Sequence, residues 1–303
     1  MRRPIVQNTS QKKPLIGFIG QGFIGKNYAD DFENRGYTVI RYTKGSAFAH
    51  NKDKIATCDI VFIAVPTPTT PKGFDCSIVQ SVLPLVGKRK IAVIKSTLLP
   101  GTTDMLQKEY HDIFVFHSPE FLREKTAAYD ASHPNRNIVG ISVESKEAKL
   151  AAQRVLSVLP KAPFEMTVRA KEAELVKYGG NNFLYIKVVY INMLFDLAKE
   201  LGCRWNVIRD AMKADARIGD SHMEPIHESG HSTETHKRAR GAGGHCFIKD
   251  FAAFSTIYEE LVGDDLGKKL LHALRDKNND LLRKSGKDID LLEGVYGTRA
   301  KRS

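Results

Sequence analysis

The chain contains no apolar run close to the roughly 20 residues that a membrane-spanning helix needs. Its first thirteen residues are polar and basic, and they lack the apolar stretch of a secretory signal peptide. We therefore expect residues 1–13 to form a flexible tail, and we expect a cytoplasmic protein that makes no contact with a membrane.

Cysteine is also scarce. The four that occur, Cys58, Cys76, Cys203 and Cys246, show neither the paired spacing of a disulfide framework nor the spacing of metal ligands. This distribution predicts reduced thiols in a reducing compartment and no bound metal.

Acidic residues are fewer than basic ones, 35 against 46, which gives a net charge of +11 over 303 residues. Apart from short clusters at the two ends and at 237–240, the basic residues are scattered along the chain. We therefore expect no nucleic-acid surface, and we attribute the excess positive charge to the binding of phosphorylated ligands. The length is sufficient for two domains.

A glycine-rich motif lies near the N-terminus. A buried-strand pattern over 14–19 leads directly into Gly20-Gln21-Gly22-Phe23-Ile24-Gly25, and a helix is expected over 26–35. A strand, G-x-G-x-x-G and a helix in this order are typical of dinucleotide binding, because the glycines let a pyrophosphate approach the backbone at the positive end of the helix. The motif therefore predicts a nicotinamide dinucleotide as cofactor.

The expected second strand, over 37–42, bears on which dinucleotide is bound. NAD enzymes usually carry an acidic residue after this strand for the ribose hydroxyls. Here Thr43 and Lys44 follow the strand, and Arg41 precedes them. The residues alone leave both NAD and NADP open.

Four further apolar segments, 59–65, 90–95, 113–116 and 137–141, are expected to be strands, and 145–158 a helix. The first three are apolar on both faces, as buried parallel strands are. We therefore predict an α/β fold in which a Rossmann-type, doubly wound domain covers residues 14–160.

The second half of the chain has a helical pattern. One long helix is expected over 171–201, within a helical central or dimerisation domain over 165–285, and a basic tail over 286–303. The helix is too apolar to pack against one Rossmann face alone. Four apolar residues at helical spacing are expected to face a second subunit: Leu184, Val188, Ile191 and Phe195. This pattern predicts a homodimer formed through the 171–201 helix.

A thiol lies beside close glycines in the segment Gly243-Gly244-His245-Cys246, and Asp250 follows four residues later. A cysteine at such a position can hold an aldehyde as a hemithioacetal until a second hydride leaves. Lys177 and Asn181 are four residues apart on the long helix, so both can point to one side.

Taken in order, several motifs resemble the UDP-glucose/GDP-mannose dehydrogenase family, and more specifically a short UDP-glucose 6-dehydrogenase. The matching segments are 20–25, 65–68, 95–97 with 100–103, 119–124, 134–136, 174–177 with Asn181, 217–219 and 243–250. The resemblance implies a Rossmann domain followed by a long dimerising helix. It also implies two NAD-dependent oxidations of a nucleotide sugar primary alcohol to the uronic acid, in polysaccharide biosynthesis. The C-terminal domain that grips the nucleotide in this family is absent from the sequence.

The resemblance assigns the catalytic roles. It implies that Asp250, acting with Lys177 and a water held by Asn181, accepts the alcohol proton. Cys246 forms the thiohemiacetal and then the thioester, and Lys177 stabilises the oxyanion. Glu120 or Glu124 activates the hydrolytic water, which Thr97 helps to position.

The resemblance also implies two sets of ligand contacts. For the cofactor these are Gly20, Gln21, Gly22, Phe23, Ile24, Gly25, Thr43, Lys44, Val65, Pro66, Thr67, Thr97 and Glu124. For the nucleotide sugar they are Phe121, Leu122, Arg123, Lys177, Asn181, Arg217, Gly243 and Gly244. NAD is favoured over NADP on the resemblance.

Two alternative functions are compatible with the residues: a single-step hydroxyacid dehydrogenase, and a catalytically idle NAD-binding module without a substrate domain. Cys246 argues against the first, because one oxidation has no use for a trapped aldehyde. The loop between Gly219 and Gly243 is longer than in the family. Its histidines, His222, His227, His231 and His236, do not follow a zinc-ligand pattern. They predict a mobile loop that covers part of the active site.

Overall fold

The computed structural model describes residues 13–45, 47–228 and 238–298. The chain divides into two compact units, which are considered separately. Unit 1 holds the residues up to Pro66, Ile78–Ser96 and Gly101–Ala173. Unit 2 holds Thr67–Ser77, Thr97–Pro100 and the residues from Glu174 onward.

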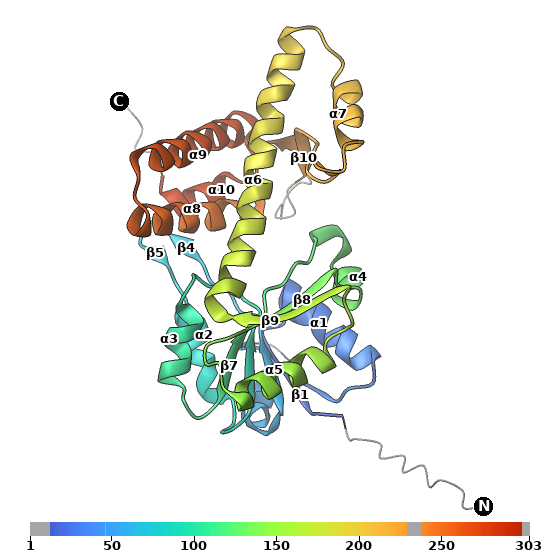
Figure 1. Cartoon of the computed structure of the whole chain (residues 1–303), viewed down its shortest axis with the longest axis vertical. Coiled ribbons are helices and arrows are strands. Elements are labelled where there is room, and N and C mark those ends of the chain that lie inside the picture. Colours follow the sequence, from blue (N-terminus) through green and yellow to red (C-terminus); the bar gives the residue numbers. More distant parts are fainter. Residues whose placement is uncertain (1–12, 46, 229–237, 299–303) are drawn as a thin grey trace, which may run out of the picture. The chain divides into compact units, whose positions relative to one another are not determined.

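Unit 1 is built on a seven-stranded sheet in the order β2-β1-β3-β6-β7-β8-β9. Figure 1 shows this sheet with helices such as α1 (Phe23–Asn34) and α5 (Lys146–Val158) beside it. The strands are β1 (Ile16–Ile19), β2 (Val39–Tyr42), β3 (Ile60–Ile63), β6 (Ile91–Ile94), β7 (Phe114–His117), β8 (Arg136–Ile141) and β9 (Phe164–Arg169). The first five run parallel, as expected, and β1, β3 and β6 are buried along their whole length. The doubly wound α/β fold expected from the sequence is therefore present.

The far edge of the sheet departs from the sequence expectation. Strand β8 runs antiparallel to β7, and β9 pairs in parallel with β8. Because β9 belongs to the sheet, unit 1 extends to Ala173, past the limit at residue 160 that the sequence suggested. The β9 side chains are all exposed or half-buried, so this edge strand has no continuous apolar run by which to recognise it.

Helices flank the sheet. They are α1 (Phe23–Asn34), α2 (Ser77–Val82), α3 (Thr102–Glu109), α4 (Ala127–Ser132) and α5 (Lys146–Val158), with 3₁₀ turns η1 (Ala49–Thr57), η2 (Leu83–Leu85) and η3 (Glu124–Thr126). Side chains of α1 and α5 share one core with the strands, in which the Phe18 and Phe62 rings stack at 5.0 Å. Ser145 caps α5 by accepting a hydrogen bond from the Ala148 N–H.

Unit 2 is mainly helical. Its helices are α6 (Ala170–Glu200), which begins in unit 1, α7 (Trp205–Lys213), α8 (Gly244–Leu261), α9 (Asp265–Ser285) and α10 (Ile289–Tyr296). Two short hairpins join β4 (Thr69–Thr70) to β5 (Gly73–Phe74) and β10 (Ile226–Glu228) to β11 (Arg238–Arg240), so the unit is not wholly helical. In its core Tyr185 of α6 stacks on Phe251 of α8 at 4.0 Å.

The face of α6 that was expected to meet a second subunit is not available for one. Val188 and Ile191 are each 1% exposed, and Leu184 and Phe195 are half-buried. A different stripe of the helix is exposed, formed by Phe183, Ile186, Tyr190, Met193 and Leu197. The helix is apolar on most sides, so its periodicity alone does not say which face packs within its own chain.

Among the residues that the structure describes, no helix combines the length and apolar character that crossing a bilayer requires.

Candidate active site

The glycine motif forms the turn between β1 and α1. Gly20 has φ +91°, and a Cβ there would lie 2.1 Å from the carbonyl oxygen of Ala64, at the end of β3. A Cβ on Gly25 would lie 1.9 Å from the Gly20 carbonyl oxygen. Gly22 has nothing within 4 Å of its Cβ position. Two of the glycines are thus required by close backbone packing, and Gly22 leaves open space above the turn.

The positive end of α1 faces that turn. Its N-cap is Gly22, no side chain caps it, and its first turn carries no acidic residue. Since β1 lies between β2 and β3, the chain leaves its strand at the point where the strand order reverses, which is where α/β sheets bind ligands. The turn therefore fits the pyrophosphate of a dinucleotide.

Arg41, close to the end of β2, has its charge balanced within the unit. Its guanidinium pairs with Asp30 and with Glu33, each at 2.7 Å, and donates to the Gln21 side-chain oxygen at 3.3 Å. This leaves Lys44, which is exposed, as the cation after β2 that could meet a 2′-phosphate. The pairing of Arg41 weakens the case for NADP that the sequence left open.

The loops after β3 and β6 are tied together by hydroxyl groups. In unit 1 the Ser96 hydroxyl donates to the Val65 carbonyl oxygen at 2.7 Å and accepts from the Val65 N–H at 2.9 Å. In unit 2 the Thr67 hydroxyl donates to the Thr97 carbonyl oxygen at 2.8 Å. These bonds fix the backbone at three of the residues expected to contact the cofactor.

The loop after β7 separates the two candidate carboxylates. Glu120 is only 5% exposed and accepts a 2.7 Å hydrogen bond from the Leu122 N–H, whereas Glu124 is exposed. The Arg136 guanidinium lies 3.7 Å from the Phe121 ring centre. A shielded carboxylate held by its own loop suits proton transfer better than a solvated one, so Glu120 is the better candidate base.

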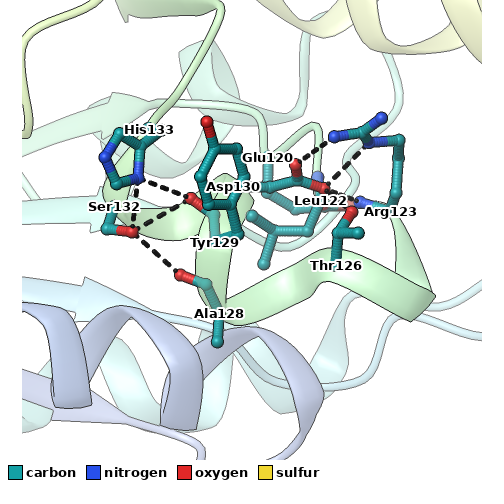
Figure 2. A network of polar contacts seen from close by, with 9 residues as sticks. All are labelled: Glu120, Leu122, Arg123, Thr126, Ala128, Tyr129, Asp130, Ser132 and His133. Carbon is teal, nitrogen blue, oxygen red and sulfur yellow. Dashed lines mark hydrogen bonds and ion pairs between the residues drawn. The ribbon is translucent and has the colours of Figure 1, made fainter.

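Figure 2 shows the polar contacts that connect this loop to α4. Asp130 of α4 accepts hydrogen bonds from the Arg123 guanidinium and N–H and from the Thr126 hydroxyl. The Arg123 guanidinium, which was expected to contact the substrate, therefore already binds Asp130.

Two residues that were not among the predicted site residues, Lys95 and Tyr28, lie next to this loop. Lys95 is 3% exposed, donates to the Ser118 hydroxyl at 3.1 Å and lies 4.6 Å from the centre of the Tyr28 ring. Burial, followed by the nearby Glu120 carboxylate, raises the pKa of Tyr28 and keeps its phenol neutral. A lysine at the end of an otherwise apolar strand was the available signal for Lys95.

In unit 2, Asn181 of α6 meets Asp250 of α8. The Asn181 amide donates to one Asp250 carboxylate oxygen at 2.6 Å, and the Lys249 ammonium pairs with the other. Asp250 is 1% exposed and Lys177, one turn before Asn181, is 5% exposed. Asn181 thus contacts the carboxylate directly through its amide nitrogen, and the water that the resemblance implies it holds stays an expectation.

Cys246 lies in the first turn of α8 and is exposed. Four residues later on the same helix comes Asp250, so the two side chains lie on the same side. The backbone just before Cys246 is fixed by a hydrogen bond in which the Gly244 N–H donates to the Asp288 carboxylate at 2.8 Å. An accessible sulfur next to a buried carboxylate is an arrangement that covalent catalysis can use.

The remaining substrate candidate, Arg217, is exposed and pairs with Asp215 at 2.6 Å. The backbone of the next two residues is held by Lys187 of α6, whose ammonium donates to the carbonyl oxygens of Ile218 and Gly219. In the segment 217–219 the backbone is therefore fixed by Lys187, and the Arg217 guanidinium is exposed.

The histidine-rich loop is only partly described, since His231 and His236 lie outside the described residues. His227 lies in hairpin β10–β11, where its Nε2 accepts from Lys287 at 3.1 Å and its Nδ1 lies 3.1 Å from the Glu224 carbonyl oxygen. Burial and the Lys287 charge lower the pKa of His227 to about 4. No cluster of potential metal ligands occurs in the described parts of the chain.

Comparison with known proteins gives the family. Residues 41–156 match the NAD binding domain of the UDP-glucose/GDP-mannose dehydrogenase family, and residues 171–280 match its central domain. The chain is 30% identical to a UDP-glucose 6-dehydrogenase of Rhizobium meliloti over 252 residues, covering 78% of this chain and 54% of the relative. It is 28% identical to one of Rickettsia conorii over 216 residues, covering 68% and 46%. The chain thus spans about half the length of the curated relatives it matches.

Solved structures agree. A UDP-glucose dehydrogenase of Pyrobaculum islandicum is 25% identical, with a TM-score of 0.73, and covers 88% of this chain and 69% of its own. A 3-hydroxyisobutyrate dehydrogenase of Mycobacterium tuberculosis is 17% identical, with a TM-score of 0.67, and covers 95% of this chain and 100% of its own. The second likeness concerns the fold alone.

Proposed function

Since the chain belongs to the UDP-glucose/GDP-mannose dehydrogenase family and carries its NAD-binding domain, we propose that it oxidises a nucleotide sugar primary alcohol to the uronic acid. The observation that carries the proposal is the exposed Cys246 thiol on the helix whose Asp250 is bonded to Asn181. The two oxidations remove four electrons in total, and the uronic acid would serve polysaccharide biosynthesis.

The cofactor contacts proposed are the turn over 20–25, Thr43, Lys44, the segment 65–67 with Thr97, and Glu124. NAD held by these residues would supply the hydride acceptor. Unit 1 contributes a glycine-rich turn and an uncapped helix end without an acidic residue in its first turn, so a diphosphate held there would meet N–H donors and no carboxylate of that turn.

In the first oxidation, Asp250 takes the proton of the alcohol as hydride leaves its carbon, which gives the aldehyde. The Asn181 amide and the Lys249 ammonium hold the Asp250 carboxylate in one orientation for that transfer. Lys177 donates to the alcohol oxygen and stabilises the negative charge that develops on it.

In the second oxidation, the Cys246 thiol gives up its proton to solvent and its sulfur bonds to the aldehyde carbon, while the C=O π electron pair moves to the oxygen, giving an oxyanion that Lys177 stabilises. Loss of hydride from that carbon leaves a thioester on the enzyme. Glu120 then takes a proton from a water that Thr97 positions, with Glu124 as the alternative base. The water oxygen displaces the sulfur, and the acid and the free thiol result.

The substrate contacts proposed are Phe121, Leu122, Arg123, Lys177, Asn181, Arg217, Gly243 and Gly244. Arg123 and Arg217 are each already paired with one aspartate. We propose that both guanidinium groups also bind the diphosphate, because a guanidinium has five N–H donors and can bridge more than one anion.

The stoichiometry of cofactor reduction tests the proposal. Full oxidation to the acid forms two NADH for each nucleotide sugar consumed. A single-step hydroxyacid dehydrogenase would form one, and an idle NAD-binding module would form none. A thermal-shift screen of nucleotide sugars with NAD present selects the substrate for this measurement, and either of the last two counts contradicts the proposal.

We also propose that the chain is a homodimer through α6. The stripe of Phe183, Ile186, Tyr190, Met193 and Leu197 is exposed, with Phe183 at 67% and Tyr190 at 55%. Its spacing of three and four residues is that of a helix face which packs against another helix.

A cytoplasmic location is supported by the four cysteines, which are all free thiols.

A further inference from the structure

The segment after α9 holds the turn that carries Cys246. This segment, residues 286–296, lies outside both ranges matched by the family. Asp288 has φ 51°, a left-handed conformation that is uncommon for a non-glycine residue, and its carboxylate accepts the Gly244 N–H at 2.8 Å. Cys246 follows Gly244 by two residues.

The fit between the segment and the turn is tight. A Cβ on Gly243 would lie 2.0 Å from a carboxylate oxygen of Asp288 and 3.0 Å from Cε of Lys287. A Cβ at position 243 would therefore displace the Asp288 carboxylate from its place beside the Gly244 N–H. Gly243 thus leaves room for the Asp288 carboxylate, and Gly244, which has φ +81°, donates its N–H to that carboxylate.

Lys287 anchors the same segment from the other side. It is 2% exposed, and its ammonium donates to the carbonyl oxygens of Gly241, at 3.0 Å, and of His227, at 3.2 Å, and to the His227 ring. These acceptors lie in the hairpin and in the chain leading to Gly243. A buried ammonium with several oxygen acceptors is held in one place, because leaving any of them unpaired is costly.

Apolar packing completes the attachment. Leu292 of α10 is fully buried with Ile248 of α8 and Leu282 of α9. Helix α10 therefore packs against α8 at Ile248, two residues after Cys246. Asp288 binds α8 at Gly244, two residues before Cys246.

We propose that Asp288 is a positioning residue for the Cys246 sulfur. The inference rests on the proposed function for its catalytic meaning. Asp288 occupies the first N–H of α8, and so it both fixes the backbone path of the turn and denies that donor to the cysteine sulfur. The catalytic turn of this chain is completed by its own residues beyond the family match.

The test compares Asp288→Ala with Asp288→Asn, which keeps an oxygen acceptor for Gly244. Asp290→Asn, an exposed carboxylate two residues further on, is the matched control. The first readout is the rate of iodoacetamide alkylation at Cys246, mapped by mass spectrometry and divided by the rate at the exposed Cys203 of the same molecule.

A small reagent needs only an accessible thiolate, whereas turnover needs the sulfur held at one position. In Asp288→Ala we expect Cys246 alkylation to rise about fivefold relative to Cys203, because the Gly244 N–H is released to stabilise the thiolate. We expect kcat with a nucleotide sugar to fall at least about tenfold, with KM for NAD unchanged. Asp288→Asn should recover kcat to within about threefold of wild type.

An alkylation ratio within twofold of wild type in Asp288→Ala refutes the inference, even if that variant melts at a lower temperature. If the ratio rises as expected but the wild-type protein forms no NADH with any nucleotide sugar, the positioning of Cys246 stands and the proposed function fails. If NADH forms normally in every variant and the ratio is constant, the proposed function stands and the positioning role fails.

Discussion

The Asn181 amide nitrogen lies 2.6 Å from a carboxylate oxygen of Asp250, although the residues are 69 positions apart in the chain. Asp250 is 1% exposed, and its other oxygen pairs with Lys249. The amide and the ammonium together compensate for the removal of the carboxylate from water. Its orientation between Asn181 of α6 and Lys249 of α8 is thereby fixed, which is what a group that accepts a proton at one place requires.

Loss of that hydrogen bond should affect both stability and turnover. Asn181→Leu leaves a buried carboxylate oxygen without its amide donor, at a cost of about 1–3 kcal/mol in the free energy of unfolding. Urea denaturation measures the stability, and NADH formation measures kcat. Asn206→Leu, at an exposed position of α7, is the control and should change neither. Wild-type stability and kcat in Asn181→Leu would show that the contact has no functional weight.

Cys246→Ser should abolish the formation of uronic acid and leave NAD binding intact. A serine hydroxyl is a far weaker nucleophile than a thiolate at neutral pH, and the cofactor turn belongs to unit 1. NADH production and calorimetric titration with NAD measure the two effects. Cys203→Ser removes the other exposed thiol and should behave as wild type. A Cys246→Ser protein that forms NADH at a near-normal rate is incompatible with the two-step mechanism.

Alanine substitutions at two glycines of the turn over 20–25 should distinguish an effect on NAD binding from an effect on stability. Gly22→Ala meets nothing within 4 Å, so we expect an unchanged melting temperature and an NAD dissociation constant raised at least about tenfold, roughly 1.4 kcal/mol. Gly25→Ala collides with the Gly20 carbonyl and should lose about 1–3 kcal/mol or more of stability. Thermal unfolding and NAD titration of both variants give the comparison. Unchanged NAD affinity in Gly22→Ala would argue against a pyrophosphate above this turn.

A charge on the exposed stripe of α6 should dissociate the proposed dimer. Tyr190→Glu places a carboxylate where apolar area is expected to be buried, at about 25 cal/mol for each Å². Light scattering at micromolar concentration should show the wild type as a dimer and the variant as a folded monomer. Leu150→Glu, on an exposed position of α5, should leave the dimer intact. A fully active wild-type monomer would refute the assembly.

The His227 ring should make the protein sensitive to acid. Burial and the Lys287 charge lower its pKa from 6.5 to about 4 in the folded state. The unfolded chain therefore binds a proton at higher pH than the native one, so stability falls as the pH drops from 6.5 toward 4. The loss is of the order of 3 kcal/mol when complete. His227→Gln, denatured with urea at pH 7 and at pH 4.5, should show a smaller difference between the two than wild type does; an equal difference would assign the acid sensitivity to other groups.

The sequence by itself determined what depends on neighbours along the chain. Gly20 to Gly25 between a strand and a helix required the cofactor turn, and the long helix expected over 171–201 is present as Ala170–Glu200. The placement of Cys246 and Asp250 on one face of a helix also follows from their spacing of four residues alone. Each of these depends on local backbone geometry and a period of 3.6 or 2 residues, which the sequence displays directly.

Only the tertiary structure decided the rest. The direction of β8 and the place of β9 in the sheet depend on which strand edge lies nearby, and an apolar alternation is the same for either direction. The buried face of α6 was decided by packing against Phe251, and the partners of Arg41 by the position of Asp30 and Glu33 on α1. The bond from Gly244 to Asp288 joins residues 44 positions apart. Such contacts form because the folded chain brings distant groups together and removes them from water, and no local pattern records which pairs will meet.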